Sequence, residues 1–347
     1  LITDESIDSN QLLEDSAEKT ELSHYPESLV VLATDWSEEL YERIHKLTLE
    51  GENGQSWLLN ECTLVNQSCN GDRAEFLLQI PSDTISFTIV LGGENGHSIL
   101  GLDESTVQVE GLKSAGVPLK QFFQENPPTM FLLNGCTISG CIHTDYGESL
   151  LQQLPDNQIE SLGWEGVDFT VESLYKSNIR RDGSIQEYMM DRLEGKGARI
   201  VFNDDNAGES ADIVAVFISE ELIRFEMVHC KYSKAESGAR LSDLYEVCGQ
   251  AIVSLRYKWR PEELLKHMER RNGMGILKGK RFHNGSQFDI DEIRKALKYT
   301  NVEFEFAIAQ PGVNHSKMTQ DMINFLGSTN STVVEMTETR LRCYFSN

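Results

Sequence analysis

Short apolar runs separated by polar turns dominate the chain before residue 150. Leu29–Leu32 and Ile85–Leu91 are runs of this kind, and their length is typical of β-strands. Apolar residues at helical spacing predict one helix over Asp35–Leu49. Together these patterns predict a mainly β domain over residues 26–155, in which we find no catalytic group of residues.

After residue 160 the pattern alternates between helical and strand periods. Asp182-Gly183-Ser184 offers an N-cap for a helix that begins at Ile185, and Gly195 and Gly197 are expected to end that helix. The later segments are predicted as strands over 198–202, 211–217 and 223–231, a helix over 239–259, a strand over 304–309 stopped by Pro311, a helix over 318–326 and a strand over 340–345. This order is typical of an α/β domain with a central mixed sheet, here over residues 160–347.

Residues 1–25 are acidic and polar and predict a disordered tail or linker. The chain contains no apolar run of the ~18–20 residues needed to cross a bilayer, so we expect no membrane span. It begins Leu-Ile-Thr-Asp-Glu, without Met and without a basic region before an apolar stretch. We therefore expect it to be a piece of a longer polypeptide.

The charge of the chain is unevenly distributed. The 347 residues include 55 Asp and Glu against 31 Lys and Arg, and residues 1–150 hold 25 of the acidic and six of the basic side chains. This balance argues against loose coating of nucleic acid but leaves room for a local basic groove. The stretch from 256 to 281 is either such a phosphate-binding surface or a solvated helix face. Its candidate DNA-binding residues are Arg256, Lys258, Arg260, Arg270, Arg271, Lys278, Lys280 and Arg281.

Seven cysteines at irregular spacings favour a reducing compartment over a disulfide framework. We therefore expect a cytoplasmic protein. Cys230 and Cys248 are expected to pack in the core.

Three polar residues interrupt the apolar strands of the second half. Asp212 stands at the start of one predicted strand, and His229 and Lys231 lie on the same face of the next. If the two strands pair, a carboxylate, an imidazole and an ammonium group meet at one end of the sheet. A lysine within an apolar strand is costly without a partner of opposite charge, so Lys231 needs an acidic partner such as Asp212.

Further oxygen donors accompany this group. Glu209 stands three residues before Asp212, and Gln186 lies on the preceding helix. Such donors can hold Mg²⁺, while a lysine orients water and offsets charge that grows on a phosphate. The candidate metal ligands are Gln186, Glu209, Asp212 and His229.

These residues resemble the core of the PD-(D/E)XK nuclease superfamily, the restriction-endonuclease-like fold. In that superfamily an acidic residue at one strand and an acid-x-lysine on the next build the metal site. Four blocks carry a narrower resemblance to the C-terminal nuclease module of large bacterial helicase-type proteins, including phage-defence ones. The blocks are Ser184–Gln186, Gly208–Asp212, His229–Ser233 and Leu244–Ala251.

The resemblance covers residues 160–347 and implies roles for single residues. A Glu or Gln on the first helix often completes the metal site, and Gln186 has that place here. Gln250 resembles the glutamine of exonuclease-like members, so the implied catalytic residues are Asp212, His229, Lys231 and Gln250. The chain departs from the pattern at His229, where a glutamate is usual. Because Mg²⁺ prefers oxygen and nitrogen suits Mn²⁺ better, His229 implies an altered metal preference or a site that binds without cutting.

The leading hypothesis is a DNA nuclease that depends on Mg²⁺ or Mn²⁺ and acts as the effector of a bacterial anti-phage defence system. The chain has no Walker motif, so ATP use would come from a helicase or ATPase partner. The alternative is a degenerate nuclease fold that serves as a DNA-binding or protein-docking module. A third hypothesis makes the acidic first domain a DNA mimic that inhibits the second. Homo-oligomers are compatible with all three.

Overall fold

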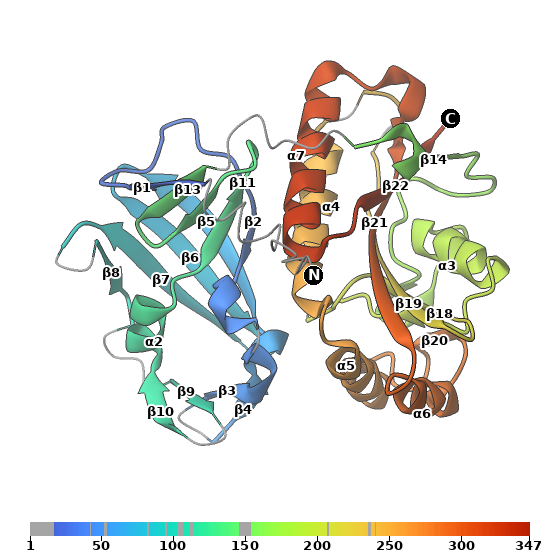
Figure 1. The fold of residues 1–347 in the computed structure, drawn as a ribbon, viewed down its shortest axis with the longest axis horizontal. Coiled ribbons are helices and arrows are strands. Elements are labelled where there is room, and N and C mark those ends of the chain that lie inside the picture. The colour runs from blue at the N-terminus through green and yellow to red at the C-terminus, as the bar shows by residue number, and fades with distance from the viewer. Residues whose placement is uncertain are drawn as a thin grey trace, which may run out of the picture. The chain divides into compact units, whose positions relative to one another are not determined.

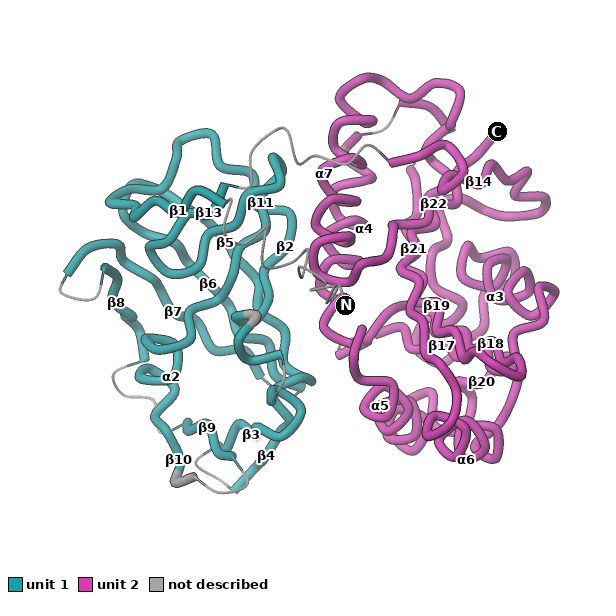
Figure 2. Tube along the Cα trace, viewed as in Figure 1, with its two compact units in different colours: residues 1–152 teal, residues 153–347 magenta. Residues whose placement is uncertain are grey.

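The computed structural model describes residues 17–145 and 154–347, apart from positions 42, 52–53, 82, 94–95, 103–106, 112–113, 207, 235–236 and 240. The chain divides into unit 1, Leu1–Gln152, and unit 2, Gln153–Asn347 (Figure 2). The described residues form a mixed α/β structure with several sheets (Figure 1). Each unit has its own hydrophobic core.

Unit 1 is built mainly from antiparallel strands. Its sheets have the orders β1-β13-β12-β11-β2, β10-β9-β3-β4 and β5-β6-β7-β8. The strands are β1 (Glu18–Glu21), β2 (Val31–Asp35), β3 (Leu47–Glu50), β4 (Ser56–Leu58), β5 (Thr63–Asn70), β6 (Arg73–Ile80), β7 (Asp83–Leu91), β8 (His97–Leu100), β9 (Gln108–Gly111), β10 (Ser114–Pro118), β11 (Thr129–Leu132), β12 (Thr137–Ser139) and β13 (Ile142–Asp145). Helix α2 (Leu119–Glu125) places Phe123 in the core, where its ring stacks 4.4 Å from that of Phe87.

Two sequence expectations for unit 1 differ from the structure. The helix predicted over Asp35–Leu49 is replaced by two short 3₁₀ turns and strand β3, because Leu47–Glu50 pair with both β4 and β9. Glu18–Glu21, expected within an unstructured tail, form β1 through pairing with β13. In both segments, strand partners distant in sequence override the local pattern. Residues 1–16 of the predicted tail lie outside the described residues.

Unit 2 is organised around a seven-stranded mixed sheet of order β14-β22-β21-β19-β18-β17-β20. Its strands are β14 (Ile159–Leu162), β17 (Ile200–Asn203), β18 (Ile213–Ile218), β19 (Leu222–Cys230), β20 (Phe282–Asn284), β21 (Asn301–Asn314) and β22 (Leu341–Ser346), with a separate hairpin of β15 (Tyr175–Lys176) and β16 (Ile179–Arg180). β19, β21, β22 and β14 run parallel, whereas β18, β17 and β20 join through antiparallel pairs.

Helices lie on both faces of this sheet. Those of unit 2 are α3 (Ile185–Gly195), α4 (Leu241–Ser254), α5 (Pro261–Gly273), α6 (Gln287–Ala296) and α7 (Gln320–Thr337). Figure 1 shows α4 and α7 on one side of the parallel strands and α3 on the other. The central strands β18 and β19 are therefore buried on both faces, which explains their nearly continuous apolar sequences.

The last part of unit 2 is more regular than the sequence predicts. β21 continues through Pro311 and Gly312, because the strand shifts its register against β22 between Gln310 and Asn314. Such an irregularity accommodates a proline, which has no N–H to donate to its neighbour. The final helix is also longer than predicted and ends at Thr337.

Candidate metal and catalytic site

The candidate site lies where β18 begins and β19 ends. The two strands are antiparallel, and Ile213 pairs with Val228. Asp212 and His229, the residues next to this pair, therefore face each other across the sheet, with His229 Nδ1 3.6 Å from Asp212 Oδ2. The pairing needed to bring these two residues together is present in the structure.

Glu209, Asp212 and His229 form one group of metal-ligating side chains. Each offers a ligand atom, and these atoms all lie within 4.8 Å of one another. Asp212 is held in place at both oxygens: Oδ1 accepts a hydrogen bond from Gln186 Nε2 at 2.9 Å, and Oδ2 accepts one from the backbone N–H of Cys230 at 2.8 Å. The carboxylate is therefore oriented before any ligand binds.

The surrounding acids repel one another. Burial and the charges of Asp212, Asp205 and Asp204 raise the pKa of Glu209 well above its usual range. Burial and the charge of Asp212 likewise raise the pKa of Asp205. Carboxylates crowded in this way are stabilised by a cation, and His229 Nδ1 is buried beside them without a hydrogen-bond partner. The donor set of two carboxylates and an imidazole thus fits a divalent metal.

Lys231 directly follows β19. Its acidic partners in the structure are Glu172 and Glu246 rather than Asp212. Its Nζ lies 3.4 Å from Glu172 Oε2 and also pairs with Glu246 of α4. The side chain is only 12% exposed. Burial alone would lower the pKa of Lys231, but Glu246 and Glu172 outweigh it and raise that pKa, so the ammonium stays charged. Lys231 is thus a buried cation with acidic partners, as expected, but these partners are Glu172 and Glu246.

The two candidate glutamines occupy different positions. Gln186 uses both ends of its amide within the protein: Nε2 donates to Asp212, and Oε1 accepts from the backbone N–H of Leu174 at 2.9 Å. This arrangement makes Gln186 a support for Asp212. Gln250 lies on α4, and its Oε1 is buried without a hydrogen-bond partner.

The basic stretch is divided between the interior and the surface. Arg256, Lys258 and Arg281 are buried, and Lys258 Nζ donates to the carbonyl of Thr337 at 2.5 Å. Arg271 binds the Asp204 side chain and the carbonyls of residues 204–206. Arg260 and Arg270 are half-buried, whereas Lys278 and Lys280 are exposed. Most of these cations are thus engaged within the fold, because desolvated arginines must find acceptors.

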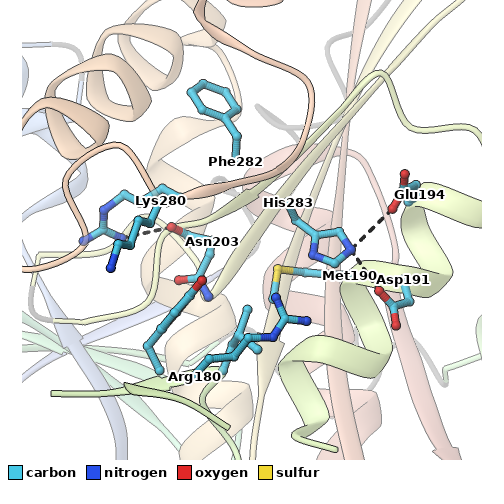
Figure 3. A pocket seen from close by; sticks show the side chains of 11 residues that line it. Arg180, Met190, Asp191, Glu194, Asn203, Lys280, Phe282 and His283 are labelled. Atoms are coloured by element: carbon cyan, nitrogen blue, oxygen red, sulfur yellow. Dashed lines mark hydrogen bonds and ion pairs between the residues drawn. The ribbon is translucent and has the colours of Figure 1, made fainter. Parts of the chain in front are cut away.

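A small pocket adjoins the site (Figure 3). Its volume is about 290 Å³, and Arg180, Asn203, Lys280 and His283 are among the residues that line it. Asn203 lies between the pocket and the site, because its Nδ2 lies 3.4 Å from Oε1 of Gln186, and Gln186 in turn donates a hydrogen bond to Asp212. Figure 3 shows the cations Arg180 and Lys280 at this pocket, where Arg180 pairs with Asp182 and Glu187 and Lys280 donates a hydrogen bond to Asn178.

A second group of possible ligands lies at the rim of the pocket. His283 Nε2 is 2.9 Å from Asp191 Oδ1 and 3.4 Å from Glu194 Oε2 (Figure 3). Both carboxylates are exposed and already contact the imidazole, as in a surface ion pair. This group is therefore a weaker metal candidate than Glu209, Asp212 and His229.

Several residues of the site are absent from the sequence prediction. Glu172 and Glu246 reach Lys231 from a loop and a helix, and Ser254 bonds His229 Nε2 at 2.6 Å. None of them stands at a recognisable spacing from the strand residues. Asp205 could have been found, since it stands shortly after the strand predicted over 198–202, just as Asp212 stands at the start of the next predicted strand.

No family model matches the chain, and no match was found among curated proteins or solved structures. Within the described residues, no helix combines the length and apolar character needed to span a membrane.

Proposed function

We propose that unit 2 is a metal-dependent nuclease of the PD-(D/E)XK superfamily that hydrolyses phosphodiester bonds of DNA. The observation that carries the proposal is the convergence of ligand atoms of Glu209, Asp212 and His229 within 4.8 Å at the start of β18 and the end of β19. Lys231 follows directly after β19. A central mixed sheet with helices on both faces supports the same assignment.

The three residues would hold Mg²⁺ or Mn²⁺. When bound, such an ion supplies positive charge that stabilises the developing negative charge on the phosphate. Lys231 contributes a second positive charge, which orients the attacking water and the phosphate oxygen. Gln186 and the N–H of Cys230 keep the Asp212 carboxylate fixed throughout. In the reaction, the water oxygen bonds to phosphorus and gives up a proton to solvent, the ester P–O bond breaks, and the leaving oxygen takes up a proton from solvent.

DNA contacts are assigned to the cations that remain accessible. Lys278 and Lys280 are exposed, and Lys280 and Arg180 line the pocket beside the site. The placement of the nuclease in a bacterial anti-phage defence system, with a helicase or ATPase partner, rests on the resemblance of the four sequence blocks.

The test is cleavage of circular and linear DNA, single- and double-stranded, with Mg²⁺ or Mn²⁺. We expect Lys231→Ala and Asp212→Ala to abolish cutting while the thermal unfolding profile stays that of a folded protein. Lys295→Ala is the matched control, because Lys295 is an exposed lysine of α6 that pairs with Glu292. Unchanged cleavage by either site variant would refute the assignment.

The alternative is a degenerate nuclease fold that binds DNA or a protein without cutting. Two observations favour it: His229 replaces the usual acid, and Lys231 is already paired with two glutamates. In that case the chain retains DNA affinity, weakened by Lys280→Ala, but cuts no substrate in Mg²⁺, Mn²⁺ or Ni²⁺. Cutting that depends on Lys231 would exclude this alternative.

A further inference from the structure

The two ring nitrogens of His229 have different surroundings. The residue is 3% exposed, so its ring nitrogens are shielded from bulk water. Nε2 lies 2.6 Å from Ser254 Oγ, near the end of α4. Nδ1 has no hydrogen-bond partner and lies 3.6 Å from Asp212 Oδ2. One nitrogen is thus anchored, and the other points toward the carboxylates.

The environment of Ser254 fixes which atom donates in this anchor. Its Oγ lies 2.6 Å from the carbonyl oxygen of Ser210 and 3.2 Å from that of Gln250, and a carbonyl can only accept. The single hydroxyl hydrogen of Ser254 is therefore donated to a carbonyl oxygen. Toward His229 the hydroxyl oxygen must accept, which assigns a hydrogen to Nε2 and leaves the lone pair of the neutral imidazole on Nδ1.

A lone pair directed at a carboxylate is unfavourable unless a positive centre lies between them. The distance of 3.6 Å from Nδ1 to Asp212 Oδ2 exceeds that of a hydrogen bond, so no hydrogen bond joins the two atoms directly. A divalent cation that binds both atoms accounts for this arrangement. Imidazole nitrogen is an ordinary ligand of Mn²⁺ and later transition metals, whereas Mg²⁺ strongly prefers oxygen.

We propose that Ser254 is a positioning residue that presents His229 Nδ1 to the metal and thereby makes the site select Mn²⁺ over Mg²⁺. This inference rests on the proposed metal group of Glu209, Asp212 and His229. In this inference, His229 replaces the usual glutamate because it selects the metal. The Ser254 hydroxyl, 25 residues further along the chain, contributes to that selection. Residues that hydrogen-bond a ligating histidine typically change metal affinity ~10–100-fold when they are replaced.

The test is calorimetric titration of the full chain with Mn²⁺ alone and with Mg²⁺ alone. We expect the wild type to bind Mn²⁺ more tightly, and Ser254→Ala to weaken Mn²⁺ binding at least ~10-fold, with a smaller change for Mg²⁺. Ser254→Thr keeps the hydroxyl and should restore Mn²⁺ affinity. His229→Glu should abolish the preference for Mn²⁺. The matched control is Ser346→Ala, which removes another buried hydroxyl bonded to a carbonyl at 2.6 Å.

Pulsed electron paramagnetic resonance of bound Mn²⁺ provides a second readout. A nitrogen coupling is expected in the wild type and in Ser346→Ala, and its loss is expected in His229→Glu.

The outcomes separate this inference from the proposed function. If the wild type binds neither ion, the metal site itself is refuted. If the wild type binds Mn²⁺ and cuts DNA, but Ser254→Ala matches it in Mn²⁺ affinity, only the role of Ser254 is overturned. If the Ser254 variants do not fold, the wild type alone still tests the inference. Equal affinity of the wild type for Mg²⁺ and Mn²⁺ would overturn it, and so would the absence of a nitrogen coupling.

Discussion

Asp204 is a fully buried carboxylate next to the candidate site. Its oxygens accept hydrogen bonds from Ser210 N and Oγ, from His267 Nε2 at 2.7 Å and from Arg271 Nε at 2.8 Å. Burial alone would raise the pKa of Asp204, but His267 and Arg271 outweigh it and hold that pKa well below its usual range. The network closes the turn between β17 and β18, which carries Glu209. Arg271 thus stabilises this turn through its contact with the buried Asp204 side chain.

Asp204→Asn is expected to lower the free energy of unfolding by about 3 kcal/mol at pH 7, because it leaves His267 and Arg271 without their anion. The folded-state pKa of Asp204 lies below the unfolded value of about 4, so its stabilisation is full above that pH and is lost as the pH falls. Urea denaturation at pH 7 and at pH 3 measures the difference.

The gap between wild type and Asp204→Asn should shrink at pH 3. Asp182→Asn serves as the control, since that carboxylate is 89% exposed. An equal loss at both pH values would contradict the assigned ion pairing.

At the scale of single elements, α3 begins with a well-formed cap. The Ser184 hydroxyl accepts a hydrogen bond from the backbone N–H of Glu187 at 3.1 Å, and Glu187 Oε2 accepts one from the N–H of Gly183 at 2.6 Å. The sequence predicts a cap within Asp182-Gly183-Ser184, and the structure places it at Ser184. The cap fixes the first turn of α3, which carries Gln186 toward Asp212.

Ser184→Ala is expected to lower the free energy of unfolding by about 1 kcal/mol, because one N–H of the first turn loses its acceptor. Urea denaturation followed by circular dichroism measures this. Ser219→Ala, in the exposed turn between β18 and β19, is the control and should change stability by less than about 0.5 kcal/mol. Equal stability of Ser184→Ala and the wild type would show that the cap contributes nothing.

The elements around the site were predictable from their sequences because they are buried on both faces. Continuous apolar runs mark β18 and β19, and pairing of these two neighbours places Asp212 opposite His229. The acids around Lys231 were not predictable, because Glu172 is 59 residues upstream and Glu246 lies on a separate helix. The helix predicted over Asp35–Leu49 fails for a related reason: β9, the partner of β3, is some 60 residues away.

At the scale of the whole molecule, the two units differ in the groups of possible metal ligands that their described residues form. Within the described residues, both groups of three possible ligands belong to unit 2. Unit 1 holds most of the excess acidic charge and a separate aromatic core, in which Phe87 stacks on Phe123 and Trp36 lies 5.8 Å from Phe123. Separate cores predict that the units unfold as separate cooperative transitions.

Leu78→Ala tests this independence. Leu78 is fully buried in the core of unit 1, so its truncation should cost about 2–5 kcal/mol. Differential scanning calorimetry of the full chain should show one transition moved to lower temperature and a second one unchanged. Because a ligand stabilises only the part that binds it, Mn²⁺ should raise the second transition alone, equally in wild type and variant. A joint shift of both transitions in Leu78→Ala would instead mean that the units unfold as one, and a Mn²⁺ response in the first transition would place the metal site outside unit 2.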